Sequence, residues 1–246
     1  MNENILMNEN ILMNNYTNFF IYNCVAYILI CIIDKIIYKF GIKGRWFCLH
    51  ALINFIIIYY SFSDVLDCIY DPNKSILPID NKYGGSFAVS IHIYHFLNFK
   101  LSKIDYIHHI GSVFSIAPLC INYQCKGLSL MYFFGSGLPG GIDYICLTLV
   151  KNNYMDRLTE KKINSYLNNY IRAPGLIITS YLFFKDSFIN TENISNTDLQ
   201  LNVPNLYYNN KFLFLAMYLN GTIFSKMAIE NYIETHYKIK DKIKDK

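Results

Sequence analysis

The stretch WFCLHALINFIIIYYSFSDVL, residues 46–66, decides the fold. One histidine and one aspartate interrupt an otherwise uncharged and mostly apolar run. A helix needs about 20 such residues to cross the roughly 30 Å hydrocarbon core of a bilayer. The whole chain has the same character, since 53% of its 246 residues are hydrophobic and only 16% are charged, a balance far from that of an average soluble domain. The sequence therefore predicts an all-α membrane protein.

The apolar runs predict a polytopic transmembrane helical bundle of about seven spans. The third run is short, and Asn168, Asn169 and Arg172 make the sixth polar, so six or eight spans are alternatives. The first run is long enough to remain as an anchor, with a peripheral position as its alternative. The predicted spans are residues 17–38, 46–66, 86–101, 104–123, 128–150, 166–184 and 212–229.

Three regions are predicted along the chain. Residues 1–15 repeat the hexapeptide MNENIL and are expected to be disordered. Residues 16–232 form the transmembrane domain, and residues 233–246 form a basic cytosolic tail. The net charge of +4 comes partly from this tail rather than from a basic face, which argues against a nucleic-acid partner.

Charge distribution predicts the orientation. Lys and Arg residues follow the first, third, fifth and seventh spans, so the positive-inside rule places the amino terminus outside and the carboxyl terminus in the cytosol. The opposite loops are poor in Lys and Arg and hold Asp67, Asp71 and Asp80. They contain triplets of the N-glycosylation type at Asn73 and Asn193, with another at Asn15 in the amino-terminal segment. The ending KIKDK resembles a cytosolic dilysine signal for retrieval to the endoplasmic reticulum, and an ordinary basic tail is its alternative.

Ionisable side chains within the predicted spans indicate a functional site, because such groups are costly in a bilayer. Counted at about 1.5 Å of rise per residue, those of five spans fall in the cytosolic half of the membrane. This shared level predicts a pocket that opens to the cytosol, although an interfacial position is the alternative for His50. The residues are His50, His92, His95, His108, His109, Asp143 and Arg172.

The pair His108-His109 is the first candidate for chemistry. Asp105 precedes the two histidines by three and four residues, on the same side of a helix. A carboxylate there fixes the imidazole tautomer and raises its basicity, as a general base near neutral pH requires. A metal site is the rival use of these histidines. A di-iron site of the desaturase type needs more histidines than the chain offers, and one zinc ion held by three rings is the remaining metal alternative.

Three segments resemble the TLC-domain family, which includes the ceramide synthases and lipid-regulating relatives. They are KGRWFCLHA (residues 43–51), DYIHHIGSVFSIAP (105–118) and GSGLPGGIDYICLTLVK (135–151), and the resemblance covers roughly residues 46–185. In ceramide synthases the paired histidines belong to a longer motif with a later His-Asp. Here His108 and His109 match the pair, and Asp143 matches one later acidic position. No histidine accompanies Asp143, a departure that shifts the resemblance toward members that influence lipid composition without catalysis.

The resemblance implies a protein of the endoplasmic reticulum that handles lipid or acyl chains. If it is an enzyme, it is an acyl-CoA-dependent N-acyltransferase, with acyl-CoA as co-substrate and no other cofactor or metal. The catalytic residues are then His108, His109, Asp105 and Asp143, and the substrate-binding residues are His50, His92, His95 and Arg172. A non-catalytic regulator or sensor of membrane lipid composition is the alternative. Membrane lipids are the predicted partners, and a homo-oligomer is an open alternative.

Overall fold

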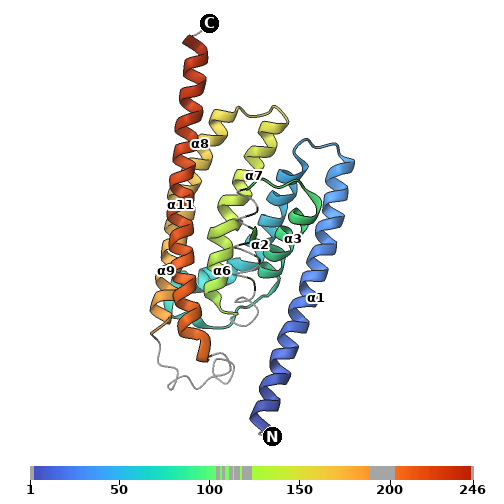
Figure 1. Cartoon of the computed structure of the whole chain (residues 1–246), viewed down its shortest axis with the longest axis vertical. Coiled ribbons are helices and arrows are strands. Elements are labelled where there is room, and N and C mark those ends of the chain that lie inside the picture. Colours follow the sequence, from blue (N-terminus) through green and yellow to red (C-terminus); the bar gives the residue numbers. More distant parts are fainter. Residues whose placement is uncertain are drawn as a thin grey trace.

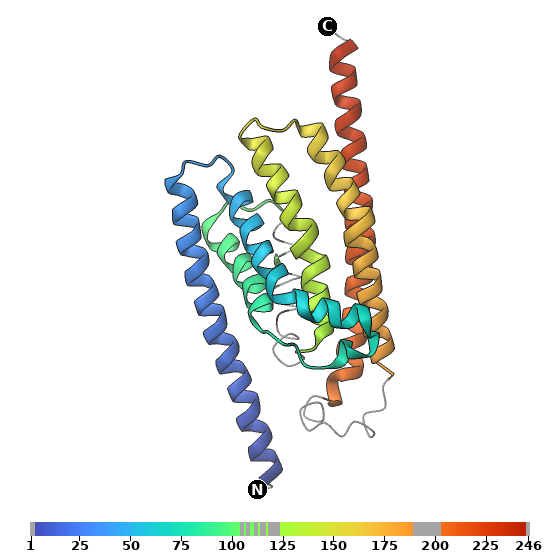
Figure 2. The ribbon, with the colours of Figure 1, turned by 180° about the vertical axis from the view of Figure 1, so that it is seen from behind.

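The structure describes residues 3–103, 106, 109, 110, 113, 117, 124–188 and 203–244. Six continuous helices account for most of this part of the chain. In this computed structural model the first three helices are α1 (Glu3–Lys39), α2 (Arg45–Tyr70) and α3 (Tyr83–Asn98), shown in Figures 1 and 2. A short 3₁₀ helix, η1 (Pro72–Ile76), lies between α2 and α3.

The remaining three helices include two that contain a π-helical segment. The fourth consists of α6 (Lys126–Tyr132), η3 (Phe133–Gly137) and α7 (Leu138–Lys151). The fifth consists of α8 (Arg157–Leu167), η4 (Asn168–Arg172) and α9 (Ala173–Asp186). The sixth is α11 (Val203–Lys244).

Four helices of the described chain are long and apolar enough to cross a bilayer, as in a multi-pass integral membrane protein. They contain the predicted spans 17–38, 46–66, 128–150 and 212–229. Large apolar side chains such as Phe20, Ile28 and Ile69 are exposed on their surfaces, as contact with lipid requires. The four segments are Tyr16–Lys39, Arg45–Tyr70, Lys126–Lys151 and Tyr207–Asp241.

The prediction of about seven spans is wrong, because the described chain has only these four candidates. The third predicted span corresponds to α3, whose 16 residues reach about 24 Å at 1.5 Å per residue, less than the bilayer core. This short helix packs against both α1 and α2. The sixth lies within the helix 157–186, where Asn168, Asn169 and Arg172 keep the segment polar. Most of the fourth, residues 104–123, lies outside the described residues.

Helices α1 and α11 extend into the two predicted end regions, residues 1–15 and 233–246. Helix α1 begins at Glu3 and therefore includes most of the MNENIL repeat, which was expected to be disordered. Helix α11 runs to Lys244 and includes most of the basic tail. Extending an existing helix needs no new nucleus, and Met, Glu, Leu and Lys are good helix formers.

Basic residues gather at one end of the bundle. The connection between α1 and α2, the connection between α7 and α8, and the carboxyl terminus all lie at the upper end in Figure 1, and the amino terminus lies at the lower end. The upper end carries Lys39, Lys43, Arg45, Lys151 and Arg157. The connection that follows α2 lies at the lower end and carries Asp71, Lys74, Asp80 and Lys82, so it lacks the excess of basic residues found at the upper end.

The turn at the basic end before α8 is closed by local caps. Asn153 adopts a positive φ of 64°, a conformation that asparagine tolerates better than most residues. Asp156 caps α8 by accepting a hydrogen bond of 2.8 Å from the Thr159 backbone N–H. The hydrogen bonds from Thr159 hold the pKa of Asp156 below its ordinary value, so the charged cap persists into mild acid and is lost only below that lowered pKa.

Helices α1, α2 and α3 are joined by the buried carboxylate of Asp34. Its Oδ1 lies 3.1 Å from Arg45 Nε, and its Oδ2 accepts a hydrogen bond of 2.7 Å from the Tyr94 hydroxyl. Since α1 otherwise presents mainly apolar side chains, this carboxylate fixes its rotation and height against its two neighbours.

Replacing Asp34 with asparagine is expected to destabilise this junction. The asparagine amide has about the volume of the carboxylate but only one acceptor oxygen. Its NH₂ group therefore faces either Arg45 or the Tyr94 hydroxyl, and both of these are donors. We expect a loss of about 1–3 kcal/mol, measured by denaturant unfolding in mixed micelles. Glu234→Gln, which removes a carboxylate from an exposed i,i+4 pair with Lys238, is the matched control. Equal stability of the two variants would contradict this role for Asp34.

The opposite end of the bundle is held together by Lys126 at the start of α6. Its ammonium lies 3.1 Å from Asp64 Oδ1, 2.6 Å from Asp67 Oδ2 and 2.7 Å from Asp80 Oδ1. Asp64 also accepts a hydrogen bond of 2.6 Å from the Ser129 hydroxyl. This lysine cluster, Lys126 with its three aspartates, joins α2, α6 and the connection before α3.

Candidate functional site

Four imidazoles lie together within the bundle. His50 comes from α2, His92 and His95 come from successive turns of α3, and the fourth is His109. The ring centroids are 6.3 Å apart for His50 and His92, 5.0 Å for His92 and His109, and 4.8 Å for His95 and His109. All four residues are buried. The structure thus brings together four of the residues that the sequence assigned to the site.

His95 and His109 form a hydrogen-bonded pair, with 2.9 Å between His109 Nε2 and His95 Nδ1. A neutral imidazole carries one N–H and one bare nitrogen, so one ring donates and the other accepts. When the donating ring takes up a proton at its other nitrogen, the bond becomes charge-assisted and stronger. The pair can therefore accept and hold a proton, which is what a general base must do.

Aromatic rings fix the orientation of two of the imidazoles. Trp46 stacks on His95 with ring centroids 3.5 Å apart and planes 20° apart, and its edge contacts His50 at 4.6 Å. His50 is also stacked on Tyr144, with ring centroids 4.2 Å apart and planes 14° apart. The stacked indole holds the His95 ring in one orientation.

His92 is oriented by the backbone of its own helix. Its Nδ1 lies 2.6 Å from the carbonyl oxygen of Ala88, one turn earlier. A carbonyl can only accept, so Nδ1 carries the proton, and in a neutral ring Nε2 is the basic nitrogen. This nitrogen is on the side of the ring away from Ala88.

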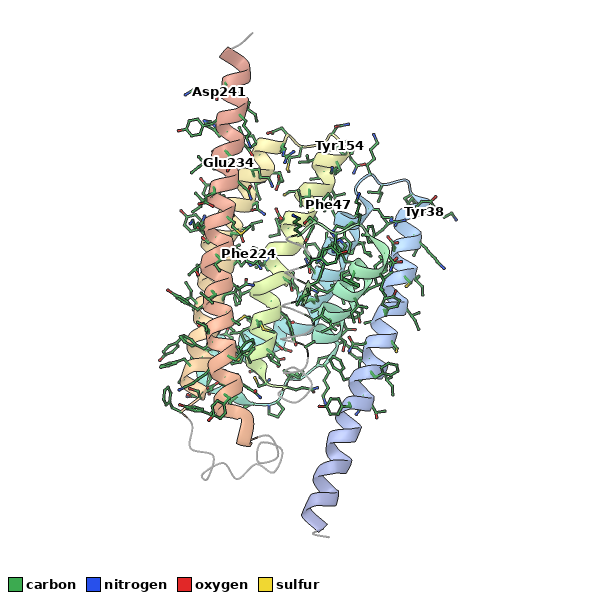
Figure 3. All side chains as sticks on the ribbon, in the orientation of Figure 1. Tyr38, Phe47, Tyr154, Phe224, Glu234 and Asp241 are labelled. Atoms are coloured by element: carbon green, nitrogen blue, oxygen red, sulfur yellow. The ribbon has the colours of Figure 1, made fainter. Side chains whose placement is uncertain are left out.

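An arginine within a predicted span needs an anionic partner, and the sequence offers Asp143, which is favoured, or a bound phosphate. In the structure Asp143 of α7 and Arg172 of η4 do not form an ion pair. Arg172 Nη2 instead donates a hydrogen bond of 3.1 Å to Asn220 Oδ1 on α11. Its guanidinium carbon lies 4.4 Å from the centroid of the Phe224 ring, a residue labelled in Figure 3. The predicted Arg172–Asp143 pair is therefore wrong. Asn220 and Phe224 of α11 contact the guanidinium instead, and the sequence does not show that α11 and η4 are neighbours.

Two of the predicted catalytic residues, His108 and Asp105, lie outside the described residues, so their placement relative to His109 stays a prediction. Within the part of the chain that the structure describes, no three His, Cys, Asp or Glu side chains are grouped as metal ligands.

The sequence analysis did not single out Trp46 and Tyr144 as members of the site. Trp46 precedes His50 by four residues on one helix, a spacing that places both side chains on the same face, so the sequence contained a signal for it. Nothing in the sequence marks Tyr144, because its contact with His50 depends on α2 and α7 being neighbours.

No protein-family model, curated protein or solved structure matches this chain. The resemblance to TLC-domain proteins therefore rests on the quoted sequence segments alone.

Proposed function

We propose that the protein binds or handles lipid acyl chains within the membrane, at a site built around the four imidazoles. The observation that carries the proposal is the 2.9 Å hydrogen bond between buried His109 and His95, with Trp46 stacked on the latter ring. Polar groups inside a membrane are costly and by default mark functional or interior-facing positions. The segments that resemble TLC-domain proteins contain Trp46, His50 and His109, which supports the same function.

If the site is catalytic, the reaction is transfer of an acyl group from acyl-CoA to a long-chain amine. The amine nitrogen bonds to the thioester carbonyl carbon, the carbon–sulfur bond breaks, and the thiolate leaves. His108 or the His109–His95 pair takes the proton that the amine loses and returns it to the thiolate. Asp105 orients the base, while Asp143 and Arg172 complete the pocket.

We also propose that the amino terminus lies outside the cytosol and the carboxyl terminus inside it. Only four helices of the described chain are candidate spans, but the helix 157–186 returns the chain from the basic end to the lower end between α7 and α11, so the two termini lie at opposite ends of the bundle (Figure 1). The concentration of Lys and Arg at one end of the bundle supports this orientation. His50 follows Arg45 by five residues, or about 8 Å along the helix, so the imidazoles are nearer the proposed cytosolic side. The family resemblance supports the endoplasmic reticulum as the compartment.

A non-catalytic regulator or sensor of membrane lipid composition is the second candidate. The imidazoles contact one another, Trp46 and Tyr144, and such contacts also serve to hold helices together. The absence of a histidine beside Asp143 in the sequence favours this candidate as well.

Replacing His109 with alanine separates the two candidates. Microsomes that contain the wild-type protein would receive labelled acyl-CoA and a long-chain base, and the lipids of the same cells would be measured. A catalytic site predicts labelled amide, reduced about 10²-fold or more in His109→Ala, because a general base contributes about 10²–10⁴-fold. A regulator predicts changed phospholipid acyl composition without new amide, and this change persists in the variant.

The control is His236→Ala, which removes an exposed histidine from α11 and should behave as wild type in both measurements. If expression of the wild-type protein neither forms amide nor alters lipid composition, the proposal of lipid handling is wrong.

A further inference from the structure

The two polar partners of Asp34 are the immediate neighbours in sequence of the two rings that stack in the candidate site. Asp34 Oδ1 lies 3.1 Å from Arg45 Nε, and its Oδ2 accepts a hydrogen bond of 2.7 Å from the Tyr94 hydroxyl. Arg45 precedes Trp46 and Tyr94 precedes His95, and the Trp46 and His95 rings stack with centroids 3.5 Å apart. Successive residues of a helix point about 100° apart, so a carboxylate on α1 can hold both helices at the level of the stack without entering it.

The stack lies between the terminal turns of two helices. Arg45 and Trp46 are the first two residues of α2, whose first turn has no side-chain cap. His95 belongs to the last turn of α3, which ends at Asn98. The terminal turns of a helix lack part of their backbone hydrogen bonds and open more easily than its interior. Trp46 and His95 therefore depend on contacts with other elements to keep one orientation.

Phe99 connects the carboxylate to the stack by a second route. The guanidinium carbon of Arg45 lies 5.1 Å from the centroid of the Phe99 ring. That centroid is 5.1 Å from the centroid of the Trp46 ring and 5.7 Å from that of His95. Only 7% of the Asp34 side chain is exposed, against 34% of the Arg45 side chain. Without the carboxylate the arginine can turn its charged end to solvent, and Phe99 then loses its cover on this side.

We infer that Asp34 is a positioning residue of the candidate site, which holds Trp46 against His95 through its two partners. The stacked indole fixes the plane of the His95 ring and, with it, the direction of His95 Nδ1, which lies 2.9 Å from His109 Nε2. The inference rests on the proposed function, in which this imidazole pair is a proton acceptor. Helix α1 then contributes orientation to the site rather than a reacting group.

Intrinsic fluorescence tests the inference, because Trp46 is the only tryptophan of the chain. The emission of the full-length protein in mixed micelles would be compared with that of His95→Ala, in the wild-type and in the Asp34→Asn background. In the wild-type background, loss of the stacked imidazole should change the intensity and wavelength of emission, since both depend on the groups in contact with the indole. In the Asp34→Asn background most of this change should be lost, because the two rings are already apart.

Gly175→Ala is the control for a general loss of stability. A β-carbon at Gly175 would lie 2.8 Å from the β-carbon of Phe134, so this variant strains the fold without touching the stack, and the effect of His95→Ala should persist in it. The inference is overturned if His95→Ala has no effect in the wild-type background, or the same effect in the wild-type and Asp34→Asn backgrounds. Loss of the effect in the Gly175→Ala background would overturn it as well.

Tyr94→Phe is the second variant, for use if Asp34→Asn does not fold. It removes one hydrogen bond of the carboxylate and keeps the ring, and an undiminished effect of His95→Ala in this background overturns the inference. The measurement contains no lipid substrate, so its failure is distinct from failure of the proposed function.

Discussion

Lys126→Met is expected to destabilise the protein severely. Its ammonium lies between Asp64, Asp67 and Asp80, and only 7% of its side chain is exposed. Methionine retains the apolar stem but removes the charge that holds three carboxylates together. The fully buried Asp64 then keeps only the hydrogen bonds from the Ser129 hydroxyl and the Asp80 backbone N–H. Removing one partner of a buried ion pair costs about 3–5 kcal/mol, a large part of the stability of a typical domain.

Folded yield and denaturant unfolding in mixed micelles would measure this effect. Lys74→Met is the matched control, because among the described residues the Lys74 ammonium pairs with Asp67 alone and 40% of its side chain is exposed, so its loss should cost about 1 kcal/mol or less. Adding Asp64→Asn to Lys126→Met removes the buried unpaired charge and should restore part of the stability. If Lys126→Met and Lys74→Met unfold at the same denaturant concentration, the lysine cluster does not stabilise the bundle.

The apolar runs predicted the positions of α1, α2, α7 and α11 because the length needed to cross a bilayer is set by its thickness. The same criterion failed for α3. Hydropathy does not distinguish a helix that faces lipid from one buried between other helices, and α3 is apolar because it packs against α1 and α2.

Depth along the helices also predicted that the histidines would lie near one level, since rise per residue is constant. Which of them would touch was not predictable. The His95–His109 bond, the contact of His50 with Tyr144 and the pairing of Arg172 with Asn220 all depend on which helices are neighbours. Lys126 was missed for the same reason, since its three aspartates are distant in sequence and nothing local marks them as partners.

Gly175→Ala is expected to disrupt the junction between the two helices that contain π-helical segments. Each π-helical segment ends two residues before a proline, Pro139 or Pro174, whose ring removes a helical hydrogen bond. Gly175 then packs directly on Phe134 of η3. A β-carbon at Gly175 would lie 2.8 Å from the β-carbon of Phe134 and closer still to its ring. Both atoms belong to packed helices, so the helices must separate or Phe134 must leave its rotamer.

Overpacking of this kind costs about 1–3 kcal/mol and sometimes more, to be measured by unfolding in mixed micelles. Gly135→Ala is the matched control, since its β-carbon would meet only Leu176 Cδ2 at an ordinary 3.7 Å, and its stability should stay within about 1 kcal/mol of wild type. Phe134→Leu should recover stability in the Gly175→Ala background and lower it in the wild-type background. If Gly175→Ala is as stable as Gly135→Ala, the close approach of these two helices is not a requirement of the fold.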